Sequence, residues 1–393
     1  MDAIRFGIIG SGKVARLHAR AIRSRGLLPT ALDQKTATGT RTEAEGAAVL
    51  DSLAADREEA PALRLAGLWA RDPSKAGAFA KDYGCASFGS IAEMGKAGVD
   101  AAIVASPHPL HREHASAAFA AGMHVLVEKP MALSVADCDA MIDAARRAGR
   151  LLGVISQRRW FPAVRRVREA IDSGKLGDTI LGQVVMLGWR DEAYYKSDPW
   201  RGSWSAEGGG VLVNQAPHQL DLLQWFMGPI AEVQAYWSNL NHPYIEVEDT
   251  AVASILFGNG ALGSILVSNS QKPGIYAKVH VHGRAGASAG VQTDGGAMFI
   301  AGMSGIAEPP VNDLWTIPGE EGQLTRWKAE DEGFFRSIEA TERFHALQFA
   351  DFAAAIATKG SPAVDGLEGR KTVELIEAIY RSGRERKPVR LPL

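Results

Sequence analysis

A short apolar run followed at once by closely spaced glycines constrains this chain more than any other feature. Ile4–Ile9 is apolar enough for a buried strand, and a helical pattern runs from about residue 13 to residue 23. The glycine pattern G-x-G-x-x-A joins the two. Such glycines permit a tight turn and a close approach of the backbone to a pyrophosphate, whose charge faces the first N–H groups of the helix. Strand, turn and helix are the context that a dinucleotide site requires. We predict that the cofactor contacts Gly10, Ser11, Gly12, Lys13, Val14 and Ala15.

The first 155 residues continue this pattern of strands separated by helices. The expected strands cover residues 65–70, 101–105, 124–127 and 151–155, and Pro73 stands in the favoured first turn of a helix. Strands that alternate with helices predict a parallel sheet with right-handed crossovers. We therefore expect an α/β Rossmann-like domain over residues 1–155. Residues 27–62 interrupt it, and we interpret them as an inserted surface excursion with a helical patch at 44–53 and no function of its own.

The second half of the chain changes to strands in series. Residues 184–189, 231–237, 250–257 and 261–268 read as strands, and Asn259-Gly260 predicts a hairpin because this pair supplies the positive φ angles of a tight turn. We expect an α+β domain over residues 156–393 with an open, mainly antiparallel sheet. Amphipathic helices at 341–356 and 369–382 are expected to pack back on one of the two domains.

Composition excludes several classes of partner. The 43 Lys and Arg residues balance 45 Asp and Glu residues, so the formal charge of −2 gives no reason to expect nucleic acid or an anionic membrane. No apolar run approaches the roughly 18 residues that span a bilayer, and we expect no signal peptide. Only two cysteines, Cys85 and Cys138, are present, which argues against a disulfide framework and a cysteine metal site. We expect a cytoplasmic protein.

The choice between NAD and NADP depends on the end of the second strand. Asp33 has the spacing of an acid that binds ribose hydroxyls, but Pro29 makes the run before it a poor central strand. With residues 65–70 as the second strand, Ala70 stands where that acid belongs and Arg71 follows. A guanidinium suits a 2′-phosphate, so we predict a slight preference for NADP. Asp72 either restores NAD binding or caps the next helix.

Three further motifs stand at fixed places after the glycine turn. They are Ser106-Pro107-His108-Pro109-Leu110-His111, then Glu128-Lys129-Pro130, then the run from Gly208-Gly209-Gly210 through Asn214 and His218 to Asp221. Together they resemble the glucose–fructose oxidoreductase/inositol dehydrogenase (Gfo/Idh/MocA) family over nearly the whole chain. The resemblance implies a nicotinamide-binding domain, an open-faced sheet domain, homodimers or homotetramers, and redox chemistry at a ring carbon of a sugar or cyclitol. It also implies a catalytic Lys129, often with a cis bond before Pro130. We assign to the cofactor site Arg71, Asp72, Ser106, His108, His111, Glu128 and Lys129.

The chain departs from the family pattern at two positions. His108 replaces an Asn, and Asn214 stands where the family often has an Asp four residues before the His. The second change removes one carboxylate, so proton transfer would rest more heavily on Lys129 and His218. Within the family, residues 194–228, 244–250 and 269–276 look most like phthalate cis-dihydrodiol dehydrogenases. That likeness implies a cyclic cis-diol that bears carboxylates.

Hydride transfer from a secondary alcohol needs a base for the hydroxyl proton and a positive group near the developing alkoxide. Lys129 follows a parallel strand at the edge where such sheets bind ligands. Asn214, His218 and Asp221 are spaced i, i+4 and i+7, which predicts one helical face. We expect His218 to transfer a proton or bind substrate, and Asn214 to bind a substrate hydroxyl. Asp221 either orients His218 or is structural.

Arginine and tryptophan clusters supply the expected substrate contacts. Arginines pair with carboxylates and aromatic faces suit a ring, although the same clusters also fit a structural role at a domain junction. With Asn214 and His218, the predicted contacts are Arg158, Arg159, Trp160, Trp200 and Arg201. His18, His111, His114 and His124 form no convincing ligand set, so we expect no metal.

The preferred function is that of an NAD(P)-dependent dehydrogenase acting on a cyclic diol or polyol. One alternative is a glycosidase-type enzyme that uses tightly held NAD for transient oxidation and elimination, with no net cofactor turnover. Another is a non-catalytic dinucleotide sensor, against which the presence of Lys129 and His218 argues.

Overall fold

The computed structural model describes residues 3–24, 61–295 and 308–393, so most of the excursion predicted at 27–62, with Asp33, lies outside it. The chain divides into two compact units. The first unit comprises Met1–Met131, Asp139–Gln157 and Thr341–Leu367, and the second comprises Ala132–Cys138, Arg158–Ala340 and Glu368–Leu393. No helix among the described residues is long and apolar enough to cross a membrane.

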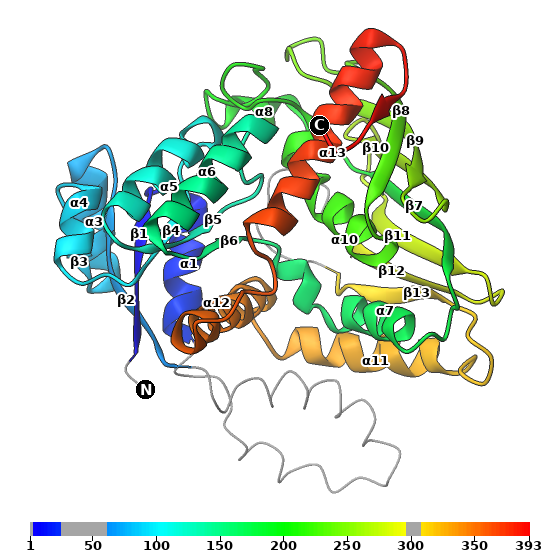
Figure 1. The fold of residues 1–393 in the computed structure, drawn as a ribbon, viewed down its shortest axis with the longest axis horizontal. Coiled ribbons are helices and arrows are strands. Elements are labelled where there is room, and N and C mark those ends of the chain that lie inside the picture. Colours follow the sequence, from blue (N-terminus) through cyan, green and yellow to red (C-terminus); the bar gives the residue numbers. More distant parts are fainter. Residues whose placement is uncertain (1–2, 25–60, 296–307) are drawn as a thin grey trace, which may run out of the picture. The chain divides into compact units, whose positions relative to one another are not determined.

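The first unit contains a six-stranded parallel sheet in the order β3-β2-β1-β4-β5-β6 (Figure 1). The strand order reverses between β1 and β4, which makes their carboxyl ends the expected ligand edge. The predicted strands are confirmed, whereas the sequence missed β3, an exposed edge of two residues with no hydrophobic run. The strands are β1 Ile4–Ile9, β2 Leu63–Trp69, β3 Ala86–Ser87, β4 Ala101–Val104, β5 His124–Val127 and β6 Leu152–Val154.

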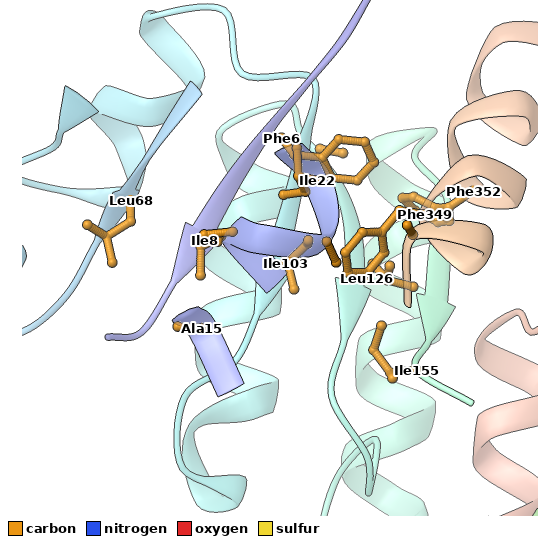
Figure 2. Packing of buried hydrophobic residues seen from close by; sticks show 14 of the residues in the cluster. Phe6, Ile8, Ala15, Ile22, Leu68, Ile103, Leu126, Ile155, Phe349 and Phe352 are labelled. Atoms are coloured by element: carbon orange, nitrogen blue, oxygen red, sulfur yellow. The ribbon is translucent and has the colours of Figure 1, made fainter. Parts of the chain in front are cut away.

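A C-terminal helix completes the core of this unit. Helix α12 contributes Phe349 and Phe352, which are fully buried with Phe6 of β1 and Ile22 of α1 (Figure 2). The rings of Phe6 and Phe349 have centroids 6.0 Å apart. Burial of side chains of this size is worth about 1.5–3 kcal/mol each. The helices with residues in this unit are α1 Lys13–Ser24, α3 Pro73–Tyr83, α4 Ile91–Lys96, α5 His111–Ala120, α6 Val135–Ala148 and α12 Ala340–Thr358.

The second unit contains an eight-stranded sheet in the order β13-β12-β11-β7-β10-β9-β8-β14. Only the β7–β10 pair is parallel, so the predicted mainly antiparallel sheet is confirmed. Helices α7, α10 and α11 pack against one face (Figure 1). The strands are β7 Thr179–Leu187, β8 Ile230–Ser238, β9 Thr250–Phe257, β10 Leu262–Ser268, β11 Tyr276–Gly283, β12 Ser288–Gly295, β13 Val311–Trp315 and β14 Val389–Arg390. The remaining helices are α7 Pro162–Asp172, α8 Glu192–Lys196, α9 Val211–Asn214, α10 Pro217–Met227, α11 Gln323–Arg336 and α13 Gly366–Glu385.

The hairpin between β9 and β10 forms where Asn259-Gly260 predicts it, but with a different turn. Only Gly260 has a positive φ, of 84°. Asn259 instead accepts a hydrogen bond from the N–H of Ala261 through its Oδ1, at 3.0 Å. This side-chain turn replaces the left-handed backbone that was expected at Asn259, while Gly260 keeps it.

The prediction that a single helix carries Asn214, His218 and Asp221 is wrong. Helix α9 ends at Asn214, and α10 begins at Pro217. Proline has no N–H to donate, so the helical hydrogen-bond ladder is interrupted at Pro217, although Ala216 before it keeps helical backbone angles (φ −75°, ψ −16°). His218 and Asp221 share α10, whereas Asn214 lies on the preceding short helix.

Candidate active site

The turn between β1 and α1 has the geometry that the glycine pattern predicts. Gly10 has a φ of 117°, and a Cβ at this position would lie 2.6 Å from the carbonyl oxygen of Ala105, so only glycine fits. A Cβ on Gly12 would meet no described protein atom within 4 Å. Gly10 therefore allows the turn to pack against the backbone of Ala105. Gly12 keeps side-chain atoms away from the start of α1.

The residues after β2 do not provide a free acid for ribose. Asp72 caps α3, accepting hydrogen bonds from the N–H groups of Ser74 at 2.9 Å and Lys75 at 3.4 Å. The hydrogen bond from the Ser74 side chain is the main cause of its lowered pKa. Of the two roles predicted for Asp72, the structure shows the capping role. Ala70 is buried and Arg71 is exposed beside it.

His111 ties together the loops that follow β4 and β5. Its ring nitrogens lie 2.9 Å from the carbonyl oxygen of Ser106 and 3.0 Å from that of Pro130. The residue is fully buried, and burial lowers its pKa. Nδ1 of His114 is 2.9 Å from the Ser106 hydroxyl. The geometry makes His111 a brace between two loops, which differs from its predicted role as a cofactor contact.

Lys129 lies on the ligand edge of the sheet. Ile9 pairs with Val104, and Val104 pairs with Val127, so the carboxyl ends of β1, β4 and β5 are level with one another in the sheet. The glycine turn, the Ser106 loop and the Glu128-Lys129-Pro130 turn consequently follow neighbouring strand ends. The bond between Lys129 and Pro130 is cis. This edge brings together the predicted pyrophosphate site and the predicted catalytic lysine.

The Glu128 carboxylate turns inward within the first unit. Oε1 lies 2.8 Å from Nε2 of His18, and Oε2 accepts a hydrogen bond from the Lys129 N–H at 3.1 Å. Burial alone would raise the pKa of Glu128. The contact with His18 and the electrostatic influence of His18, His345 and Lys129 outweigh burial and lower the pKa to about 2. Glu128 is therefore a partly buried anion beside Lys129, with both oxygens engaged by the protein.

A polar cluster in the second unit surrounds Tyr194; we call Tyr194, Arg201, Glu207, Asn214 and Gln215 the tyrosine cluster. The Tyr194 hydroxyl accepts hydrogen bonds from Asn214 Nδ2 at 3.2 Å and Gln215 Nε2 at 3.0 Å. The Arg201 guanidinium lies 4.3 Å from the centre of the tyrosine ring. Asn214 also donates to Glu207, which accepts from the Gly202 N–H at 2.6 Å.

Sequence reasoning missed Glu207. Asn214 stands where a carboxylate was expected, and the structure supplies a buried carboxylate in contact with it from seven residues earlier. An acid directly before three glycines was the available signal.

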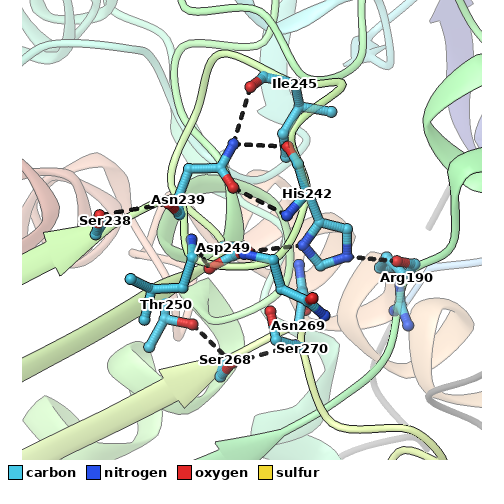
Figure 3. Close-up of polar contacts among 12 residues, drawn as sticks. Arg190, Ser238, Asn239, His242, Ile245, Asp249, Thr250, Ser268, Asn269 and Ser270 are labelled. Atoms are coloured by element: carbon cyan, nitrogen blue, oxygen red, sulfur yellow. Dashed lines mark hydrogen bonds and ion pairs between the residues drawn. The ribbon is translucent and has the colours of Figure 1, made fainter.

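A second buried network, centred on His242 and Asp249 (Figure 3), is linked to the tyrosine cluster through Asn269. Nδ1 of His242 lies 2.7 Å from Asp249, and its Nε2 lies 2.7 Å from the Arg190 carbonyl oxygen. The Asn269 N–H donates to the Asp249 carbonyl oxygen, and Asn269 Nδ2 donates to Gln215 at 2.9 Å. Burial tends to raise the pKa of Asp249, but the His242 hydrogen bond and two backbone donors lower it. The network fixes the amide of Gln215 and hence its bond to Tyr194.

Asp221, on α10, and Arg159 form a buried ion pair. Two bonds, of 2.9 Å and 2.6 Å, join them, and Arg159 also reaches Glu368 at 2.9 Å. The guanidinium lies 4.9 Å from the Trp225 ring centre. This favours the structural alternative for both residues over substrate binding by Arg159. His218 lies one turn before Asp221 and is 9% exposed.

The other predicted substrate contacts are dispersed within the second unit. Arg158 contacts Asp294 and donates to Thr293 at 3.1 Å, and Trp160 is buried. Trp200 lies beside Arg201, whose guanidinium is 4.4 Å from its ring centre. Only Arg201 and Asn214 of the predicted set join the tyrosine cluster.

Two family models match the chain. The oxidoreductase family with an NAD-binding Rossmann fold covers residues 4–156, and the GFO/IDH/MocA C-terminal domain covers residues 164–289. The chain belongs to the Gfo/Idh/MocA oxidoreductase family. The predicted resemblance is confirmed, and with it an NAD(P)-dependent enzyme whose first unit carries an NAD-binding Rossmann fold.

Members of the Gfo/Idh/MocA family with different substrates are similar to this chain. The 1-carboxy-3-chloro-3,4-dihydroxycyclohexa-1,5-diene dehydrogenase of Comamonas testosteroni is 33% identical over 202 residues, 50% of this chain and 49% of that protein. The putative UDP-kanosamine synthase oxidoreductase subunit of Amycolatopsis mediterranei is 30% identical over 334 residues, 79% of this chain and 86% of that protein. The WlbA dehydrogenase from Bordetella pertussis, solved with NADH and UDP-GlcNAcA, has a TM-score of 0.79 at 28% identity, covering 100% of this chain and 99% of the other.

Proposed function

We propose that this enzyme oxidises a secondary alcohol on a ring substrate, with a carboxylated cis-dihydrodiol as the favoured class and a sugar or cyclitol as the wider one. The observation that carries the proposal is the position of Lys129 on the same sheet edge as the glycine turn. The similarity to a dehydrogenase of a carboxylated dihydroxycyclohexadiene supports the favoured class. The similarity to a dehydrogenase solved with a sugar nucleotide that bears a uronic acid supports an anionic substrate.

Lys129 and His218 are the proposed proton-handling pair. A neutral Lys129 amine accepts the proton of the substrate hydroxyl, and the ammonium that results stabilises the alkoxide as it forms. A bound nicotinamide would supply the hydride acceptor. Asn214, held by Tyr194 and Glu207, orients a substrate hydroxyl. Arg201 or Arg158 supplies the positive charge for a substrate carboxylate.

Single-residue variants test the acid–base assignment. Lys129→Ala and His218→Ala should each lower kcat by about 10²–10⁴-fold, because general acid–base help has that value, with NAD(P) affinity nearly unchanged. Since the two act on one proton, the double variant should lose much less than the product of the single losses. Steady-state kinetics over a range of pH measures this. A His218→Ala enzyme with full turnover and an unmoved pH profile would refute the role of His218.

The charge of the substrate is tested with matched ligands. Arg201→Ala should raise KM on a carboxylated diol far more than on its uncharged analogue, because loss of a paired arginine costs about 2–5 kcal/mol when the partner charge stays buried. Arg158→Ala is compared in the same way, and Arg159→Ala serves as the structural comparison. Equal losses on both substrates would point to a structural role.

The glycosidase-type alternative is decided by cofactor turnover. A dehydrogenase accumulates reduced nicotinamide in proportion to product, whereas transient oxidation and elimination regenerate the oxidised form. We expect the absorbance of reduced nicotinamide to rise steadily with a panel of cis-diols, inositols and sugars. Product release without that absorbance would favour the alternative.

A further inference from the structure

Two buried histidines near the Lys129 turn, His18 and His345, have no role in the proposed chemistry. His18, on α1, is fully buried, and His345, on α12, is 3% exposed. Their ring centroids are 5.2 Å apart, and one ligand-capable atom of each, together with an oxygen of Glu128, lies within 4.8 Å of the others. Three elements far apart in sequence thus meet at one carboxylate inside the first unit.

His18 is the residue in direct contact with that carboxylate. Its Nε2 lies 2.8 Å from Glu128 Oε1, although neither ring nitrogen makes a hydrogen bond of acceptable angle among the described residues. The ring and the carboxylate are therefore in close contact without a well-aligned hydrogen bond, in surroundings where burial leaves little water to screen their interaction. The second Glu128 oxygen binds the Lys129 N–H at 3.1 Å, so His18 acts on the Lys129 backbone through one side chain.

His345 lies behind this pair. Its Nδ1 lies 2.6 Å from the Thr341 carbonyl oxygen and donates to it, which fixes the tautomer and leaves Nε2 without a proton in the neutral ring. Burial, and then the nearby His18, lower its pKa to about 4. His345 is consequently a neutral ring that packs beside His18 and supports its contact with Glu128.

We propose that His18 is a positioning residue for the Lys129 turn, acting through the Glu128 carboxylate with His345 as its support. The inference rests on the proposed function of Lys129. His18 holds the strand end that carries Lys129 and stabilises the anionic form of the Glu128 carboxylate beside it. The groups that face Glu128 are His18 from α1, His345 from α12, His111 from α5 and Lys129 itself.

Removal of His18 should disturb both the place and the proton affinity of Lys129. Without His18, the negative charge of Glu128 is less balanced, and the Lys129 ammonium beside it should hold its proton more tightly. An opposite charge within about 4–6 Å shifts a pKa by roughly 1–3. The kcat of His18→Ala should thus be lower by roughly tenfold or more. The acidic limb of its plot of kcat against pH should move to higher pH by about one pH unit. NAD(P) affinity should change much less than kcat.

A conservative variant separates position from charge. His18→Gln replaces the ring with a neutral amide donor near Glu128. It should recover most of kcat measured at high pH, while its acidic limb stays shifted as in His18→Ala. His282→Ala, a half-buried histidine of β11 in the second unit whose Nδ1 faces Ser288, is the matched control and should leave both quantities unchanged.

The experiment measures kcat and KM against pH for the wild type and these variants, with circular dichroism and NAD(P) titration as checks of folding. Loss of turnover in Lys129→Ala together with a wild-type pH profile in His18→Ala would overturn this inference alone. Full turnover in Lys129→Ala would overturn the proposed function first. Stoichiometric zinc binding by the wild type that disappears in both His18→Ala and His345→Ala would assign the cluster to a metal instead.

Discussion

At the scale of single residues, the two glycines of the β1–α1 turn have different tasks. Gly10 is required by the fold because Ala105 occupies the space that a side chain would take. A Cβ on Gly12 would meet no atom of the described residues within 4 Å, so we expect a side chain at this position to face what binds at the turn. Substitution at Gly12 therefore reports on the cofactor rather than on stability.

Gly12→Asp should weaken NAD(P) binding by orders of magnitude while the protein stays folded. The carboxylate would stand against the pyrophosphate charge and block its approach to the α1 N–H groups. Calorimetric titration with both cofactors, alongside a thermal melt, measures the effect. Gly77→Asp on α3, which also has no neighbour within 4 Å, is the control. Unchanged affinity in Gly12→Asp would reject the pyrophosphate site.

The predicted preference for NADP over NAD depends on Arg71. Asp72 is committed to capping α3, so Arg71 is the charged group left exposed at the end of β2. Arg71→Ala should raise the Kd for NADP more than the Kd for NAD, and Arg64→Ala on the same strand should change neither. A wild-type preference for NAD above about tenfold, or 1.4 kcal/mol, would contradict the prediction.

At the scale of elements, the three glycines before α9 let that helix start against a buried acid. Glu248 accepts hydrogen bonds from the N–H groups of Gly210 at 2.9 Å and Leu212 at 3.0 Å and from the Tyr380 hydroxyl at 2.9 Å. Burial is the largest influence and, against these donors, raises its pKa to about 7. The short helix that ends at Asn214 is therefore anchored by a group that titrates near neutrality.

This titration predicts a pH-dependent stability. The pKa of Glu248 is about 7 in the folded protein against an ordinary 4.5, so the unfolded chain releases this proton first as pH rises. The contribution is fully present below about pH 4.5 and is lost by pH 7, a fall of about 3 kcal/mol in the free energy of unfolding. Urea denaturation between pH 5 and 8 measures it. Glu248→Gln should flatten this slope, whereas the exposed Glu246→Gln should retain it; equal slopes in both would contradict the assignment.

At the scale of the whole molecule, the sheet of the second unit leaves apolar side chains uncovered on alternate positions. Along β9 and β10 the inward residues are buried, while Val252 is 48%, Leu256 39%, Leu262 59% and Leu266 37% exposed. Contiguous exposed apolar surface of this kind marks association sites. It supports the proposal that the enzyme is a homodimer or homotetramer through this face.

Leu262→Lys should therefore shift the protein toward smaller species. A buried unpaired lysine in the middle of an interface costs several kcal/mol, whereas on a free surface it costs little. Sedimentation velocity at several concentrations gives the result. Leu240→Lys, 72% exposed in the loop after β8, is the control. An unchanged distribution, or a wild-type monomer, would contradict assembly through this face.

The sequence by itself determined the features that depend on residues close together in the chain. The glycine turn, the alternating strands of the first unit and the Glu128-Lys129-Pro130 motif were all predictable, because turn geometry, hydrophobic period and motif spacing are local properties. The break at Pro217 could also be read from the missing N–H of proline, although the i, i+4, i+7 spacing concealed it.

Only the tertiary structure decided which distant side chains share one buried space. His18 and His345 are separated by most of the chain, yet both lie against Glu128. The pairing of Arg159 with Asp221 and the approach of Glu207 to Asn214 likewise depend on how helices and loops pack. A buried polar group must find a partner wherever the fold brings one, and that partner carries no signature in the linear spacing.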